Sequence, residues 1–403
     1  VMTEACQSGS LAVQAPQSVS QGGGLPGGDD GDISSLVAAA LSGDAAAARQ
    51  LAVLSEQDQA RLIDAGALEP MVSMLGSTSE TVAGETVVTV AGETEVRRSV
   101  LAALANLALV DENQELIAAA LTPERVVALL RDKDEQVQLH AAGAVANLSF
   151  QNAELERAFV RAGAVPALLE LVRAPTLEGA VATEGAAALA NLARNPSNRH
   201  TIAAAEAVEP LGTLAARGGA EAGRLVARCI CNLALPSHDV ASRDGGHSEP
   251  ATAAAAAASN PDPPTSPVSE ETQRLLLRQR ALDPLVGLAR KFAATDAELA
   301  RLVTTAIHAL SALPEGAAAI IHAQGVSPLL DLLKNSGLED VQLMAVETVL
   351  RISRQEHLRG RLMDRGAVAA LISLARAETE PLKSCVVEAL THLSSSGGLS
   401  QSC

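Results

Sequence analysis

The chain of 403 residues has no tryptophan, no tyrosine and only three phenylalanines, Phe150, Phe159 and Phe292. Proteins that bind single-stranded nucleic acid stack bases on clustered aromatic side chains, which this sequence does not offer. It is also short of cations, with 30 Lys and Arg against 47 Asp and Glu, a formal net charge of −17. Because clustered cations bind phosphate backbones, we expect no nucleic acid partner.

Cysteines are few, at positions 6, 229, 231, 385 and 403. An odd number in a long chain argues against a disulfide framework. No apolar run reaches the length of a membrane span, and residues 1–32 contain no Lys or Arg, so the positive start of a signal peptide is missing. We therefore expect a soluble protein without an integral membrane segment, in the cytoplasm, with the nucleus as an alternative.

Two short sequence motifs, called phrases below, recur along the chain with a common period of about 42 residues. The first contains a proline, and the second ends in a column that begins with four asparagines. The prolines lie at 70, 123, 166, 210, 284 and 328, with Ala370 in the last copy. The column contains Asn106, Asn147, Asn191, Asn232, Ala312, Arg351 and His392. Two landmarks with one period indicate internal repeats, about seven of them.

Each repeat has the pattern of three helices. A short first helix ends near a glycine, as at Gly66, Gly163, Gly325 and Gly366. The proline then suits the start of a second helix, where its missing N–H is no loss. A longer third helix ends in the asparagine phrase. One such unit cannot bury its apolar face alone, whereas stacked units can, so the sequence predicts an all-α solenoid of three-helix repeats.

Composition sets the predicted boundaries. Two stretches have the composition of insertions, one with VAGET twice and one with an alanine run followed by PDPPTSP. We predict a disordered N-terminal segment at 1–32, a two-helix cap at 33–55, a repeat array at 56–396, a loop insertion at 76–94, a disordered insertion at 236–270 and a tail at 397–403.

The phrases GAVPALL (163–169) and ALANLA (188–193) resemble armadillo repeats, and the resemblance covers nearly all of the predicted array. It implies a right-handed superhelix whose third helices line a concave groove. In that groove a partner lies extended, and asparagine amides pair with its main chain. Helices pack 8–10 Å apart and a strand advances about 3.3 Å per residue, so one repeat would serve about three partner residues.

Positions four and eight before the column share its helical face. In the first four repeats these positions hold three arginines and no acid, so we expect a mildly basic groove for an acidic or apolar segment. The predicted peptide-binding residues are Asn106, Asn147, Asn191, Asn232, Arg98, Arg224 and Arg228. The alternative is that each asparagine only bonds a neighbouring helix end and that the arginines are ordinary solvated residues.

Armadillo proteins of the nuclear-import type, which bind the nuclear-localisation signals of other proteins, have tryptophan four residues before the asparagine. Here those positions hold Ala102, Gly143, Ala187 and Arg228, and the chain has no tryptophan. The resemblance therefore favours a non-enzymatic interaction scaffold or adaptor over a nuclear-import adaptor. The alternative role is the substrate-recognition part of a larger ubiquitin ligase or of a cytoskeletal or ciliary scaffold.

Chemical motifs are weak throughout the chain. The segment GGGLPGG (22–28) lacks the Lys-Ser/Thr that follows a phosphate-binding loop. Four residues with metal-binding side chains lie inside the predicted disordered insertion, namely His238, Asp239, Asp244 and His247. We predict no catalytic residues, no cofactor and no metal site. The oligomeric state is left open.

Overall fold

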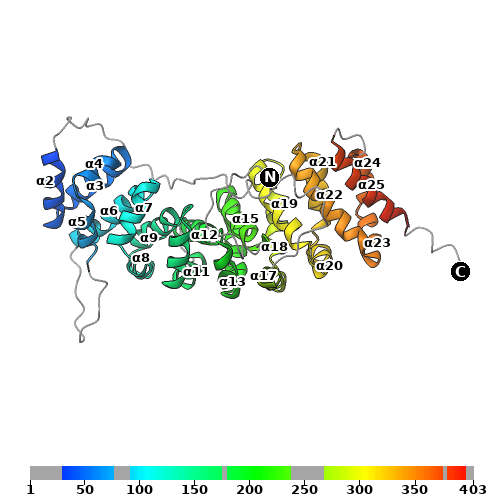
Figure 1. Ribbon diagram of the computed structural model, residues 1–403, viewed down its shortest axis with the longest axis horizontal. Coiled ribbons are helices and arrows are strands. Elements are labelled where there is room, and N and C mark those ends of the chain that lie inside the picture. Colours follow the sequence, from blue (N-terminus) through cyan, green and yellow to red (C-terminus); the bar gives the residue numbers. More distant parts are fainter. Residues whose placement is uncertain (1–29, 77–90, 175–178, 237–266, 375–378, 396–403) are drawn as a thin grey trace, which may run out of the picture. The chain divides into compact units, whose positions relative to one another are not determined.

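The computed structural model describes residues 30–76, 91–174, 179–236, 267–374 and 379–395. These fall into two compact units, an N-terminal one up to residue 198 and a C-terminal one from residue 199 (Figure 1). The described residues form twenty-three helices. The prediction of an all-α chain of three-helix repeats is confirmed, because after two initial helices the rest fall into seven successive triplets.

The N-terminal unit begins with α2 (Asp30–Leu41) and α3 (Ala45–Gln57), which pack against each other. Three triplets follow. They are α4 (Gln59–Asp64), α5 (Leu68–Met74) and α6 (Ala91–Leu107); α7 (Asp111–Ala120), α8 (Pro123–Leu129) and α9 (Glu135–Leu148); and α10 (Ala153–Arg161), α11 (Ala164–Arg173) and α12 (Ala180–Leu192).

The boundary between the units falls within α13. Four triplets run from α13 to the last described helix. They are α13 (Pro196–Ala204), α14 (Val208–Arg217) and α15 (Ala220–Ala234); α17 (Pro267–Arg278), α18 (Leu282–Phe292) and α19 (Ala297–Leu310); α20 (Pro314–His322), α21 (Val326–Asn335) and α22 (Glu339–Arg354); and α23 (Glu356–Asp364), α24 (Ala367–Leu374) and α25 (Glu380–Ser394).

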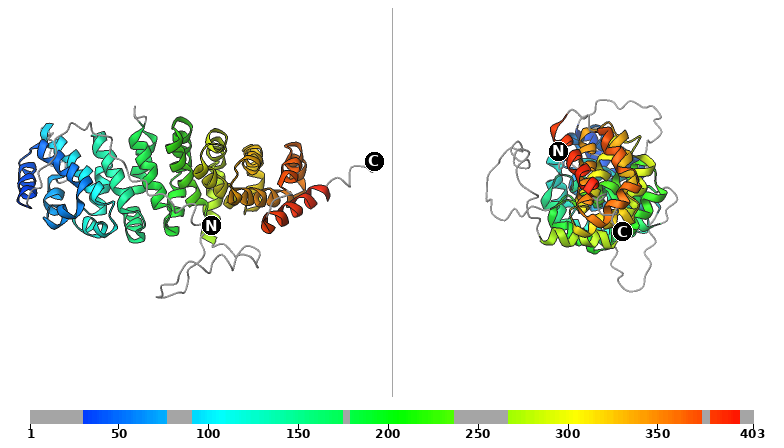
Figure 2. Two further views of the ribbon diagram at one scale, coloured as in Figure 1. Left: turned by 90° about the horizontal axis from the view of Figure 1, so that it is seen from above. Right: turned by 90° about the vertical axis from the view of Figure 1, so that its right-hand side faces the viewer.

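Third helices of successive repeats pack side by side within each unit (Figure 2). In the N-terminal unit α3, α6, α9 and α12 form one row, and in the C-terminal unit α15, α19, α22 and α25 form another. In the N-terminal unit the position five residues before the asparagine column is fully buried, at Leu101, Ala142 and Ala186. The small side chains of Ala142 and Ala186 let neighbouring helices approach closely, which is consistent with the alanine-rich third helices.

In six of the seven repeats the turn between first and second helices contains a residue in the left-handed backbone conformation; the exception is the turn from α7 to α8, where Leu121 has a φ of −111°. Gly66, Gly163 and Gly366 adopt it, but so do Glu206, Arg280 and Gln324. In the sixth repeat the left-handed residue is Gln324, with a φ of 57°, whereas the neighbouring Gly325, near which the first helix was expected to end, has a φ of −75°. Gly325 has a packing reason instead, since a Cβ there would lie 3.1 Å from Cγ2 of Ile320.

Three helices begin inside segments that we expected to be non-helical. The helix α2 starts at Asp30, α6 at Ala91 and α17 at Pro267. In α17 proline occupies the first position, where it is favoured, and Glu270 in the first turn complements the helix dipole, so these residues favour the earlier start. The remaining parts of the predicted segments, 1–29, 77–90, 237–266 and 397–403, lie outside the described residues.

Candidate functional site

Three of the predicted asparagines lie in one column on consecutive third helices of the N-terminal unit. Asn147 of α9 donates from Nδ2 to the carbonyl of Ala105 on α6, at 2.8 Å. Asn191 of α12 donates to the carbonyl of Ala146 on α9, at 2.7 Å. Asn106 donates to Oγ of Ser55 on α3, at 3.1 Å. Each amide therefore ties its repeat to the preceding third helix.

The other half of each amide makes no hydrogen bond to the described part of the chain. The Oδ1 atoms of Asn106, Asn147 and Asn191 accept no hydrogen bond from the described residues, and solvent reaches them. An asparagine side chain both donates and accepts. The structural role, in which each asparagine bonds a neighbouring helix, therefore uses the donor and leaves the acceptor without a partner among the described residues.

The residues four positions before these asparagines are small. They are Ala102, Gly143 and Ala187, and both alanines are half-buried. A Cβ added to Gly143 would meet only Oε2 of Glu184, at an ordinary contact distance of 3.9 Å. Packing between helices therefore does not require glycine here, although glycine inside a helix costs about 1 kcal/mol. Together with the three asparagines, these residues form what we call the amide face.

Arg98 lies beside the amide face, and carboxylates hold it. Its guanidinium donates from Nε to Oδ1 of Asp134 at 2.9 Å, from Nη2 to Oδ2 of the same carboxylate, and from Nη1 to Glu95 at 3.3 Å. The hydrogen bond from Arg98 holds the pKa of Asp134 below its usual value. Arg98 therefore does not offer a free cation to a partner.

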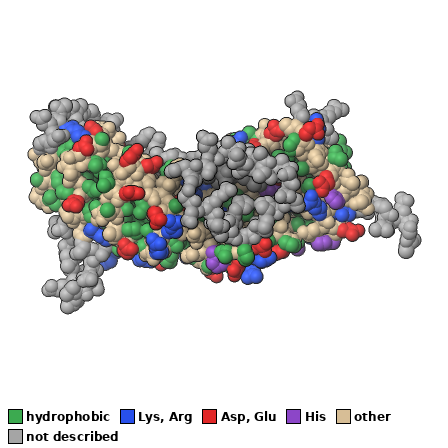
Figure 3. Space-filling view, viewed as in Figure 1, with side chains coloured by type: hydrophobic (Ala, Val, Ile, Leu, Met, Phe, Trp, Pro, Cys, Tyr) green, Lys and Arg blue, Asp and Glu red, His purple; other side chains and the backbone are tan. Residues whose placement is uncertain are grey.

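Arg224 and Arg228 lie on α15 in the C-terminal unit and are paired in the same way. Arg224 donates to Asp296 at 2.7 Å, and Arg228, which is 6% exposed, donates to Glu298. These acids stand at the start of α19, where carboxylates cap the helix. The prediction of a mildly basic groove is wrong, because counting three positions per helix missed the acids of the next helix. Acidic and basic side chains are interspersed on the face shown in Figure 3.

Asn232 is also on α15 and is only 2% exposed. Further along the column, Arg351 replaces asparagine and donates from Nη1 to the carbonyl of His308 at 2.9 Å.

Sequence reasoning missed a second set of amides on first helices. Gln59 and Gln114 donate to the carbonyls of Asn106 and Asn147, at 3.0 and 3.2 Å. Their recurrence about one repeat apart was the available signal.

Two histidines on third helices stay neutral. Burial lowers the pKa of His140 to about 4 and that of His308 to about 3. For His308 this burial outweighs the carboxylate of Glu347, which lies 3.4 Å from Nε2. Neither ring is poised to exchange a proton near neutral pH.

Metal-binding side chains do not cluster in the described part of the chain. No group of three metal-binding side chains gathers there, and His238, Asp239, Asp244 and His247 lie outside it. None of its helices alone is long and apolar enough to cross a membrane. The helices α20 and α21 meet the length and composition criteria only as a pair, bent by 91°.

Solved structures share this fold. A designed armadillo repeat protein is 22% identical, with a TM-score of 0.52, and the match covers 67% of this chain and 99% of that one. Another, in complex with the peptide (KR)4, is 22% identical with a TM-score of 0.52, covering 68% and 99%. An engineered protein is 26% identical with a TM-score of 0.53, covering 91% and 92%. No family model and no curated protein matches the chain. The chain has an armadillo-type helical repeat fold.

Proposed function

We propose that the chain is a non-enzymatic protein-interaction scaffold that holds an extended partner segment along the amide face of α6, α9 and α12. The observation that carries the proposal is the column of Asn106, Asn147 and Asn191, each with an open Oδ1 acceptor. The designed armadillo protein that binds the peptide (KR)4 supports peptide binding by this fold.

An apolar segment suits this face better than an acidic one. Since Asp134 and Glu95 already neutralise Arg98, an acidic partner would have to displace them. The small side chains at Ala102, Gly143 and Ala187 leave room for a backbone to approach the helices. We therefore propose a partner with small or aliphatic side chains, recognised mainly through its main chain.

Asn232, Arg224 and Arg228 are candidate contacts on the C-terminal unit. Because Asp296 and Glu298 hold both arginines, we expect these residues to contribute less to partner binding than the amide face does.

A peptide-display selection on the immobilised protein tests the function. Selected peptides are measured by calorimetry against the wild type and against the double variant Asn147→Ala/Asn191→Ala. Arg161→Ala, at the exposed end of α10, serves as the control. We expect the double variant to lose at least tenfold in affinity and the control to bind unchanged. Selected peptides that bind the folded double variant as well as the wild type would rule out the amide face.

A further inference from the structure

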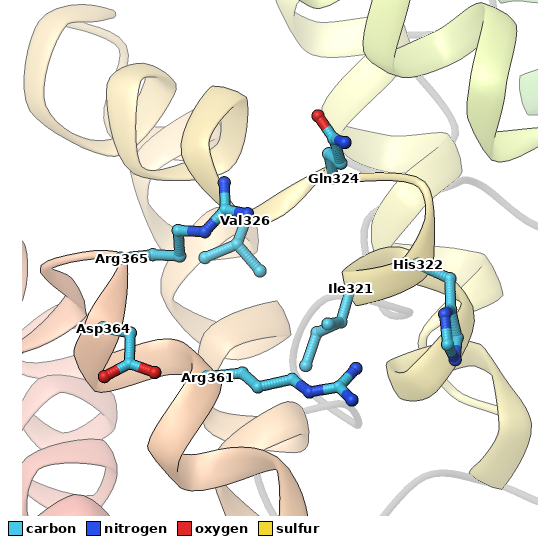
Figure 4. A pocket seen from close by; sticks show the side chains of 7 residues that line it. All are labelled: Ile321, His322, Gln324, Val326, Arg361, Asp364 and Arg365. Carbon is cyan, nitrogen blue, oxygen red and sulfur yellow. The ribbon is translucent and has the colours of Figure 1, made fainter.

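A cavity of about 400 Å³ lies away from the third helices, between the sixth and seventh repeats of the C-terminal unit (Figure 4). One wall comes from the end of α20 and the start of α21, and the other comes from α23. The lining residues are Ile321, His322, Gln324, Val326, Arg361, Asp364 and Arg365. The amide face contributes nothing to this cavity.

Two exposed arginines, Arg361 on α23 and Arg365 directly after it, line the cavity without a carboxylate partner among the described residues. Arg361 makes no hydrogen bond or ion pair with any described residue. Arg365 has only a long contact, from Nη1 to Oγ of Ser327 at 3.4 Å. Asp364 lines the same cavity, yet it pairs with neither arginine. Arg361 and Arg365 lie one helical turn apart, so their positive charges repel each other. At Arg98 a carboxylate, Asp134, neutralises the arginine, but no carboxylate of the described residues does so here. The pair is therefore free to bind an anion.

The opposite wall is fixed and adds further donors. Arg290 donates from Nη2 to the carbonyl of Gln324 at 3.0 Å and so holds the left-handed turn that forms the rim. Ile321 and Val326 form the apolar part of this wall. The imidazole of His322 supplies a ring N–H on the side that Arg361 faces (Figure 4).

We propose that this cavity binds a phosphate-type oxyanion, either free or carried by a small molecule or side chain. Two guanidinium forks and an imidazole offer more N–H donors than the two oxygens of a carboxylate can accept, whereas a tetrahedral oxyanion can satisfy donors from several directions. This site is independent of the proposed scaffold function, because it shares no residue and no helix with the amide face.

Phosphorus NMR titrations and calorimetry with the whole chain test the proposal. The probes are inorganic phosphate and O-phosphoserine, with serine as the neutral comparison. The variants are Arg361→Gln, Arg365→Gln and Arg361→Lys, and the control is Arg161→Gln, an exposed arginine on α10. Circular dichroism verifies that each variant folds.

We expect saturable binding of at least one phosphate probe by the wild type and the control, and none of serine. Each glutamine variant should weaken that binding about tenfold, because a charge-assisted hydrogen bond is lost. Arg361→Lys, which keeps the charge without the fork, should fall between. Tighter binding of O-phosphoserine than of inorganic phosphate would indicate a side-chain or small-molecule carrier. Equal affinity in wild type and glutamine variants, or no saturation with either probe, would overturn the proposal.

Discussion

Asn147 Nδ2 donates to the carbonyl oxygen of Ala105 across the boundary between two repeats, over 2.8 Å. The same amide leaves its Oδ1 facing solvent. One residue type thus joins two repeats with its donor and, in the function we propose, binds the partner with its acceptor. This explains how asparagine can recur on consecutive third helices while only part of its hydrogen-bonding capacity is used inside the fold.

The first prediction concerns that hydrogen bond. Asn147→Ala should destabilise the chain by about 1–2 kcal/mol, because a buried hydrogen bond between repeats is lost. Asn335→Ala, at the exposed end of α21, should change the stability by less than about 0.5 kcal/mol. Urea unfolding followed by far-ultraviolet circular dichroism measures both, since the chain has no tryptophan for fluorescence. An equal effect of the two substitutions would mean that the hydrogen bond between the repeats does not contribute to stability.

Gly143 gives a prediction in which stability and binding change in opposite directions. Gly143→Ala should stabilise the chain by about 0.5–1 kcal/mol, because helix propensity improves and a Cβ has room. In the binding mode we propose, the added methyl group lies where the partner's backbone approaches, so binding of a selected peptide should weaken. Unfolding curves and calorimetry on the same preparation test both halves. Higher stability with unchanged affinity would remove Gly143 from the binding face.

The buried His308 should make the folded chain less stable in acid. Its pKa is about 3 in the folded chain and about 6.5 when unfolded, so below pH 6.5 the unfolded state binds a proton that the folded state does not. Between pH 7.5 and pH 5.0 this histidine should remove on the order of 2 kcal/mol of stability. Urea midpoints at the two pH values, compared between wild type and His308→Gln, isolate this contribution. The same pH dependence in the variant would show that His308 is not its source.

The left-handed turns give a paired prediction. Glu206→Gly should stabilise the chain by about 0.5–1 kcal/mol, because glycine adopts a φ of 59° without steric cost. Gly163→Ala, at a φ of 86°, should destabilise it by about 1 kcal/mol or more. Thermal unfolding by circular dichroism checks the opposite signs. Loss of stability in Glu206→Gly would mean that the glutamate side chain makes a contribution larger than the backbone strain.

Much of the fold was predictable because periodicity is a property of the sequence itself. The prolines and the asparagine column place second and third helices without any knowledge of contacts. Charge was harder to predict, since Arg98 and Asp134 are 36 residues apart and meet only when two repeats stack. The left-handed role of Gln324 was also missed, because tertiary packing can impose a conformation that the residue type disfavours.

The most direct test of the central claim is a backbone scan of a selected peptide. Each peptide N–H is replaced in turn by N-methyl, which removes one donor and leaves the side chains unchanged, and calorimetry measures the affinity for the wild-type chain. Repeats spaced by one helix diameter should each serve about three peptide residues. We therefore predict losses of affinity that recur about every third residue and disappear at the corresponding position in Asn147→Ala. A scan with no such period, or one that Asn147→Ala leaves unchanged, would contradict recognition through the amide face.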